Sequence, residues 1–225
     1  GDNLEANNTY LTYLIGKRFW VLGSSISDFY LASVGFPNLW PYRKQFMVSH
    51  GISYSEPTQT FQELHVSEWS LITSTSQNKC KICGINAYKL AINDFHIYKN
   101  TLFGIVNLWG RVTEHEYGYR AEYAYPSEIY GSYCFMCETY TPILQSVFVK
   151  RCDLELSVFF TYYKYFPCWV FCSENCALKW FDNFFKIRNQ KDKTIFKDRS
   201  GYEMEVLNSN KVLDMLQSSY GLKIK

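Results

Sequence analysis

The stretch that decides the fold is 103–126, FGIVNLWGRVTEHEYGYRAEYAYP. Its first ten residues are rich in β-branched and aromatic side chains, which favour a strand. Its last eight alternate between two faces, with tyrosines on one face and Arg120, Glu122 and Ala124 on the other. Gly118 suits a tight connection that needs a positive φ. We therefore predict a β-hairpin with one buried and one polar face, whose second strand ends at Pro126.

Charged residues gather at the turn of this hairpin and on its second strand. They are Glu114, His115, Glu116, Arg120 and Glu122. One interpretation is a solvated turn, with an ion pair between Arg120 and Glu122 on the polar face. The alternative is an enzyme site lined by Trp109, Tyr117 and Tyr119. In such a site His115 and the glutamates would transfer protons, and the arginine would bind a carboxylate or a phosphate.

Common catalytic motifs are missing from the sequence. The run after His115 differs from the His-Glu-x-x-His motif of zinc proteases, because Tyr119 stands where the second histidine should be. There is no phosphate-binding loop, dinucleotide glycine fingerprint or nucleophile elbow. These absences argue against the commonest nucleotide enzymes and serine hydrolases, and they leave other enzymes open.

Composition indicates a folded chain without a membrane span. The 225 residues are 47% hydrophobic and 19% aromatic, which suits one large or two small domains. The net charge of +2 is too small to indicate a polyanionic partner. The most apolar run, 158–171, is interrupted by Lys164 and Pro167, so we expect no transmembrane helix. The first residues show no basic and apolar leader, so we expect no signal peptide.

The pattern along the chain predicts an α+β fold. We expect helices at 2–15, 173–187 and from about 208 to Gly221, strands at 17–23 and 28–33, and a hairpin at 193–207. Ser173 should cap the second helix, and the last helix should bury Val212, Leu213 and Leu216. Residues 1–130 then form a β-rich half and 131–225 a Cys-rich half that contains helices. A single domain stays open.

Six of the eight cysteines occur in pairs with spacings typical of metal ligands. Cys80 and Cys83 form one Cys-x-x-Cys pair, Cys134 and Cys137 form another, and Cys172 and Cys176 are separated by three residues. Paired thiolates at these spacings favour zinc over a disulfide framework, because a chain of this length needs no disulfides to fold. Disulfides and buried free thiols are the alternatives. Zinc thiolates favour a reducing compartment, and we expect the cytoplasm.

The cysteines of the second half resemble those of a known zinc fold. Cys134 and Cys137 form a knuckle, and FCSENC (171–176) is followed by the aromatic residues Trp180 and Phe181. This arrangement resembles treble-clef fingers of the TRASH and MYM type. The resemblance implies a closed, structural Zn²⁺ site made of four thiolates.

A second resemblance covers residues 28–130. The segments DFYLAS, NLWP, MVSH, LHVSEW, CKICGINAY and LWGRVTEHEYGYRAEYAYP are similar to a family of uncharacterised bacterial proteins. By position, a cysteine and a histidine of that family fall near His50 and His65. The resemblance thus implies a second site of His50, His65, Cys80 and Cys83, although this knuckle has two intervening residues where the family usually has one. Rival ligands are Cys152, Cys168, His96 and His115.

The sequence therefore favours a cytoplasmic binding or interaction module stabilised by one or two Zn²⁺ ions. Its partner would be a protein or a small molecule, and we expect no membrane. One alternative is an enzyme that uses His115, Glu116 and Arg120. Another is a nucleic-acid-binding protein, because basic and aromatic residues are interleaved over 179–199. The helical spacing of those aromatic residues also fits a buried core.

Overall fold

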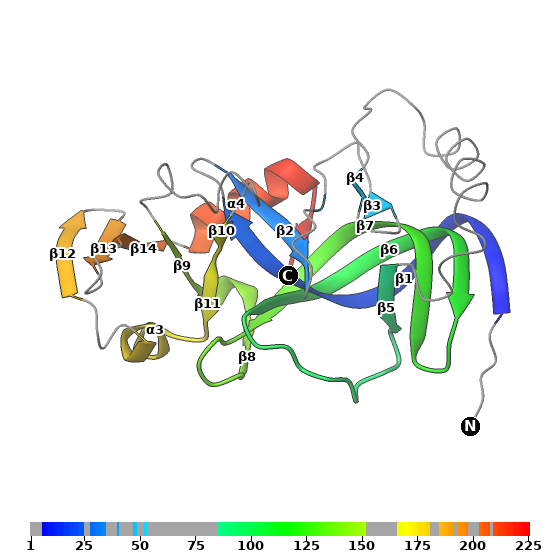
Figure 1. The fold of residues 1–225 in the computed structure, drawn as a ribbon, viewed down its shortest axis with the longest axis horizontal. Helices are drawn as coiled ribbons and strands as arrows, with labels where there is room; N and C mark the ends of the chain where they lie inside the picture. Colours follow the sequence, from blue (N-terminus) through cyan, green and yellow to red (C-terminus); the bar gives the residue numbers. More distant parts are fainter. Residues whose placement is uncertain are drawn as a thin grey trace. The chain divides into compact units, whose positions relative to one another are not determined.

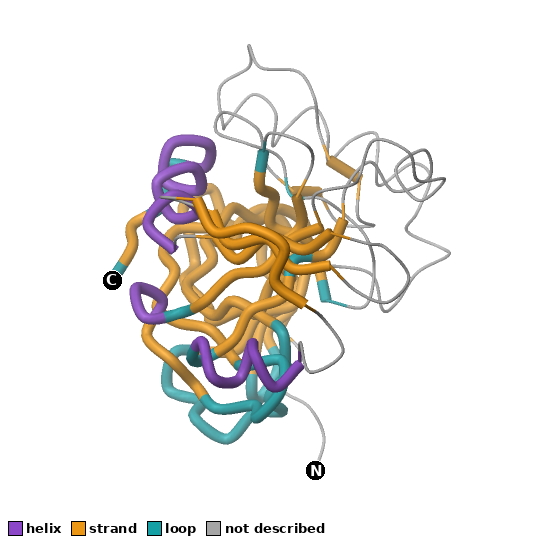
Figure 2. The backbone as a smooth tube through the Cα atoms, turned by 90° about the vertical axis from the view of Figure 1, so that its left-hand side faces the viewer, coloured by secondary structure: helices purple, strands orange, loops and turns teal. Residues whose placement is uncertain are grey.

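The computed structural model is rich in strands and has two α-helices, α3 and α4, among the residues that it describes (Figures 1 and 2). The predicted α+β class is therefore confirmed. The described residues are 6–24, 28–34, 40, 47–48, 52–53, 85–151, 166–180, 185–190, 193–197, 203–207 and 209–225. None of the helices in this part of the chain is long and apolar enough to cross a membrane.

Two compact units make up the chain, and each is described by itself. Unit 1 comprises Gly1–Arg18, Trp40–Phe95 and Ile105–Ser127. Unit 2 comprises Phe19–Leu39, His96–Gly104 and Glu128–Lys225. Three long strands contribute residues to both units: β1 (Ala6–Ser24), β6 (Thr101–Glu114) and β7 (Gly118–Tyr133).

Unit 1 is built around the predicted hairpin of β6 and β7. These strands pair with each other, and the His115 N–H donates to the Gly118 carbonyl at 2.8 Å to close the turn. Strand β5 (Ile85–Lys89) pairs antiparallel with both β1 and β7. The short strand β3 (Met47–Val48) pairs with β4 (Ile52–Ser53) and with β7. The hairpin prediction is confirmed.

Two details of that prediction are wrong. Strand β7 continues through Pro126 to Tyr133, because a proline can stand in a strand where no partner needs the missing N–H. Gly118 does not have a positive φ. It is needed there because a Cβ would lie 2.4 Å from the Ala87 carbonyl oxygen on the neighbouring strand.

The positive φ of the hairpin lies at Gly110, inside β6. Its φ is +79°, and a Cβ there would lie 2.6 Å from Cδ2 of Tyr123. The Trp109 and Tyr123 rings stack next to it, with centroids 5.9 Å apart. The Glu122 carboxylate accepts a hydrogen bond from the Arg111 N–H at 3.1 Å. The Trp-Gly-Arg run is thus a bend in the strand, held by side chains of the facing strand.

The first predicted helix, 2–15, is wrong. Residues 6–24 form strand β1, and residues 2–5 lie outside the described part. Pairing in a sheet explains the difference, since β1 is one continuous strand that pairs with β5, with β6 and with β2 (Phe29–Ser33). Hydrogen bonds to a neighbouring strand outweigh a weak helical pattern. The strands predicted at 17–23 and 28–33 are confirmed.

Unit 2 contains a five-stranded antiparallel sheet in the order β11-β9-β14-β13-β12. These strands are β9 (Val147–Arg151), β11 (Trp169–Phe171), β12 (Phe185–Gln190), β13 (Lys193–Lys197) and β14 (Glu203–Leu207). The predicted hairpin at 193–207 is confirmed as the pair β13 and β14. The smaller elements of the unit are β8 (Tyr140–Pro142), η1 (Ile143–Gln145), β10 (Phe166–Pro167) and β15 (Lys223–Ile224).

The helices of unit 2 differ in how well the sequence predicts them. Helix α4 (Ser209–Tyr220) is confirmed and buries Val212, Leu213 and Leu216 as expected. The Tyr220 hydroxyl accepts a hydrogen bond from the Leu31 N–H at 2.9 Å, which holds the end of the helix. The helix predicted at 173–187 is too long. Helix α3 spans Glu174–Trp180, and 185–190 pairs with β13 as strand β12.

The bend at Gly110 yields a stability prediction. Gly110→Ala should lower the free energy of unfolding by about 2–4 kcal/mol, because the new Cβ meets a left-handed backbone and the Tyr123 ring. Asn107→Ala, at a half-buried position in the same strand, is the control and should cost less than about 1 kcal/mol. Denaturant unfolding followed by tryptophan fluorescence measures both. An equal decrease in the free energy of unfolding in the two variants would contradict this explanation of the bend.

Candidate metal centre

Cys134 and Cys137 lie in a tight knuckle between β7 and β8. The Cys134 N–H donates to the Thr139 carbonyl at 3.1 Å, and the Glu138 N–H donates to the Cys134 carbonyl at 3.0 Å. Glu138 has a φ of 61°, which turns the chain back toward β8. The Met136 N–H lies 3.4 Å from the Cys134 sulfur and donates to it. The backbone thus supplies a hydrogen bond to the Cys134 sulfur.

Cys172 and Cys176 lie where β11 passes into α3. Cys172 follows directly after Phe171, the last residue of the strand, and Cys176 is in the first turn of the helix. The predicted helix cap is confirmed, because Ser173 Oγ accepts the Cys176 N–H at 3.2 Å. The Ser173 carbonyl accepts the Ala177 N–H, also at 3.2 Å. Positive partial charge at the first turn of a helix stabilises thiolates.

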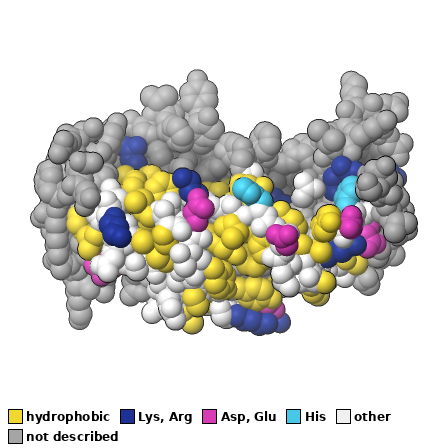
Figure 3. Space-filling view, turned by 90° about the horizontal axis from the view of Figure 1, so that it is seen from below, with side chains coloured by type: hydrophobic (Ala, Val, Ile, Leu, Met, Phe, Trp, Pro, Cys, Tyr) yellow, Lys and Arg dark blue, Asp and Glu magenta, His cyan; other side chains and the backbone are white. Residues whose placement is uncertain are grey.

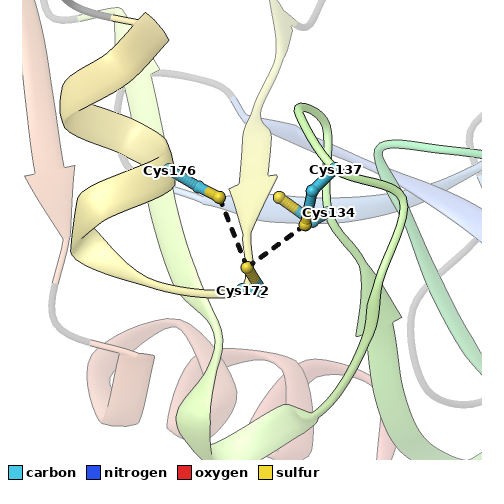
Figure 4. Close-up of side chains that lie close together, drawn as sticks. All are labelled: Cys134, Cys137, Cys172 and Cys176. Carbon is cyan, nitrogen blue, oxygen red and sulfur yellow. Dashed lines mark hydrogen bonds between the residues drawn. The ribbon is translucent and has the colours of Figure 1, made fainter.

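The two cysteine pairs meet at one point of unit 2. Figure 4 shows the four side chains of Cys134, Cys137, Cys172 and Cys176 directed toward one another from the knuckle, the strand end and the helix. All four sulfur atoms lie within 4.8 Å of one another. The distance from Cys172 Sγ is 3.5 Å to Cys137 Sγ and 3.5 Å to Cys176 Sγ.

These distances fit a metal ion better than disulfides. Zn–S bonds of about 2.3 Å place tetrahedral sulfur atoms roughly 3.8 Å apart, close to the 3.5 Å that separates Cys172 Sγ from its two neighbours. A disulfide would require a separation of about 2.05 Å, and all four cysteines are free thiols. The residues present therefore fit an ion held by four thiolates.

Aromatic side chains form the buried side of the cluster. Trp180 of α3 packs on Phe135, Phe171 and Trp169, with ring centroids 5.7, 5.8 and 4.9 Å away. Cys134 is fully buried in this core, whereas Cys137 is exposed. Trp180 itself is half-buried and packs against this core. The cluster is therefore buried on the side of Cys134 and exposed to solvent on the side of Cys137.

The pKa values of three of the four thiols are shifted from their usual range. Hydrogen bonds with Thr139 are the main reason that the pKa of Cys137 falls to about 6. Burial is the largest cause that raises the pKa of Cys172 to about 12, and the neighbouring Cys137 and Cys176 thiols add to it. Burial also raises the pKa of Cys176. At neutral pH the metal-free cluster therefore keeps protons that a divalent cation would displace.

The charged residues of the hairpin have separate surroundings in unit 1. Glu114 forms a 2.8 Å ion pair with Lys89. Glu116 and Tyr117 are exposed at the turn, where the charge of Glu116 and its hydrogen bond raise the pKa of the Tyr117 hydroxyl. Glu122 is buried, with only 4% of its surface exposed. The expected polar face of β7 is therefore wrong, because the face that carries Glu122 packs around the bend at Gly110.

The remaining predicted residues of the hairpin are partly buried. They are His115, at the turn, and Arg120, which stands opposite Asn86 in the ladder with β5. Within the described ranges, only the four cysteines form a group of three or more His, Cys, Asp or Glu side chains close enough to hold a metal. The catalytic set His115, Glu116, Arg120 and Glu122 stays a prediction.

The predicted second metal site cannot be followed in the structure. His50, His65, Cys80, Cys83 and the rival ligand Cys152 lie outside the described residues, so that site stays a prediction. The other rivals can be placed. Cys168 is buried and stands apart from the cysteine cluster, and burial raises its pKa to about 12. His96 is exposed, and its ring lies 4.7 Å from that of Tyr98.

Comparisons with known proteins do not assign the chain to a family. No family model matches it, and neither a curated protein nor a solved structure does. The function must therefore be inferred from the site itself.

The raised pKa values predict that metal binding releases protons. Cys172 and Cys176 are protonated in the metal-free protein at pH 7.5, so each bound ion should displace at least about two protons. The apparent affinity should therefore rise with pH between 6.5 and 8.5. Below pH 6 the dependence should become steeper, because Cys137, with a pKa of about 6, then also binds a proton.

Calorimetric titration with Zn²⁺ in buffers of different ionisation enthalpy counts the released protons directly. An affinity that stays constant from pH 6.5 to 8.5 would show that the ligands are thiolates before the metal arrives. That result would contradict the conclusion that burial keeps Cys172 and Cys176 protonated.

Proposed function

We propose that the chain is a zinc-stabilised interaction module, in which Cys134, Cys137, Cys172 and Cys176 hold one Zn²⁺ ion. The observation that carries the proposal is the meeting of these four sulfur atoms within 4.8 Å of one another. Four thiolates in a tetrahedral arrangement suit zinc. A closed set of four protein ligands leaves no position for water or substrate, so the ion has a structural role.

The surrounding elements support a site of the treble-clef type. One ligand pair comes from a knuckle after a strand, and the other comes from a strand end and the first turn of a helix. Treble-clef fingers, which the sequence resembles, combine these two sources of ligands. Thiolate ligands also favour a reducing compartment, and for this reason we propose the cytoplasm.

A role in binding agrees with apolar side chains on both halves of the site. Met136, between the two knuckle cysteines, is 44% exposed, and Leu178 on α3 is 43% exposed. On the face drawn in Figure 3, hydrophobic side chains are exposed among Lys or Arg, Asp or Glu, and His side chains. Exposed apolar surface marks interaction sites. The bound ion would fix Met136 and Leu178 in place for a protein or small-molecule partner.

The two alternative functions stay predictions. The enzyme alternative needs His115, Glu116 and Arg120 to converge on a substrate. The nucleic-acid alternative depends on 179–199, where most side chains lie outside the described ones. Two aromatic residues of that stretch, Trp180 and Phe196, pack in or against the buried core of unit 2.

The proposal predicts a loss of one zinc ion per chain in Cys172→Ser. Cys168→Ala is the matched control, because Cys168 is a free thiol of the same unit that stands apart from the cluster. It should keep the wild-type zinc content. Elemental analysis of the purified proteins measures both the identity and the number of ions. Equal metal content in wild type and Cys172→Ser would overturn the proposed site.

Removal of the ion should unfold its surroundings locally. Hydrogen exchange should accelerate in peptides that cover 133–140 and 168–180 when a chelator is added, because metal binding contributes directly to the folding of such sites. The hairpin 105–127 of unit 1 should keep its protection and serves as the internal control. Acceleration confined to the hairpin would place the metal elsewhere.

A further inference from the structure

Asn100 connects the two halves of the metal centre. It immediately precedes β6, belongs to unit 2, and has a positive φ of 60°. Its backbone N–H donates to the Tyr133 carbonyl at 2.9 Å. Its side-chain Oδ1 accepts the Val170 N–H at 2.9 Å, and its Nδ2 donates to the Cys168 carbonyl at 3.3 Å. One residue thus makes three hydrogen bonds to two segments that are distant in the sequence.

The partners of Asn100 lead directly to the metal ligands. Tyr133 immediately precedes Cys134, the first cysteine of the knuckle. Val170 lies in β11, two residues before Cys172. The two segments also touch each other through a direct bond, because the Phe135 N–H donates to the Val170 carbonyl at 2.8 Å. Asn100 and this bond together fix the relative position of the cysteine pairs.

The chemistry of an asparagine suits this position. Asparagine tolerates a left-handed backbone better than most residues. Its amide offers an acceptor for the Val170 N–H and a donor for the Cys168 carbonyl. Aspartate would keep the acceptor and lose the donor, whereas glycine would keep the backbone conformation and lose both. The neighbouring Lys99 lies over the Phe135 ring, with Nζ 5.5 Å from its centroid, and adds a second contact with the knuckle.

We propose that Asn100 is a positioning residue for the metal centre. It holds the knuckle and the strand end at the separation at which four sulfur atoms can share one ion. The inference rests on the proposed zinc site and assigns to it a residue outside the Cys-rich segments. Groups that orient metal ligands typically change metal affinity by about 10–100-fold when they are removed.

Zinc affinity in competition with a chelating dye tests the inference. Asn100→Gly should raise the Kd for Zn²⁺ by about 10–100-fold, and Asn100→Asp should have a smaller effect because Oδ1 can still accept the Val170 N–H. The absorption spectrum of the Co²⁺-loaded protein should also change in Asn100→Gly, because that spectrum reports the arrangement of the ligands. Asn93→Gly, at an exposed asparagine of unit 1, should keep the wild-type Kd.

A second variant separates positioning from general stability. Leu216→Ala removes a fully buried side chain of α4 in the same unit. It should lower the melting temperature at least as much as Asn100→Gly, yet leave the Kd within about threefold of wild type and the Co²⁺ spectrum unchanged. A wild-type Kd and Co²⁺ spectrum in Asn100→Gly would overturn the inference. An equal rise of Kd in Leu216→Ala would also overturn it.

A different result would refute the proposed function. Cys172→Ser measured in the same competition assay would then match wild type, which would remove the proposed zinc site and the role of Asn100 with it. A large loss of zinc affinity in Cys172→Ser, together with a wild-type Kd in Asn100→Gly, would refute the positioning role alone.

Discussion

Four thiol groups brought within 4.8 Å of one another are the constraint on which the local structure of unit 2 depends. Trp180 packs against Phe135, Phe171 and Trp169 in the region of these cysteines. Burial raises the pKa of Cys172 to about 12. Without a cation Cys172 and Cys176 keep their protons at neutral pH. With a divalent ion, the same closeness joins a knuckle, a strand end and a short helix into one unit.

The hairpin in unit 1 shows that an unusual sequence motif can serve packing. Its Glu-His-Glu run and its Tyr-Arg-Ala-Glu run resemble a catalytic set when they are read as letters. In the structure Gly110 bends β6 over Tyr123, and the buried Glu122 accepts the Arg111 N–H at that bend. Gly110 leaves room for the Tyr123 ring, which stacks on Trp109, and the Glu122 carboxylate accepts a backbone N–H. The motif has this structural explanation whether or not the hairpin also binds a ligand.

The sequence predicts elements well where local patterns and pairing agree. The tight turn at 115–117 and the buried stripe of α4 are local features, and both were predictable. Strand β1 was not, because pairing with neighbouring strands of the sheet outweighs a helix-like pattern in its first residues. The length of α3 was overestimated for the same reason, since 185–190 pairs with β13. Cysteine spacing predicted the cluster of four cysteines. Thr139 and Asn100 carry no spacing signal, because they contact this region only in the folded chain.

A correlation spectrum between protons and ¹¹³Cd tests the proposed metal centre most directly, because it identifies ligands residue by residue through bonds to the metal. In the cadmium-substituted protein, we predict one cadmium resonance coupled to the β-protons of Cys134, Cys137, Cys172 and Cys176. A resonance that couples Cys134 and Cys137 to Cys80 and Cys83 instead would contradict this assignment. In that case the knuckle and the first turn of α3 would not share a metal ion.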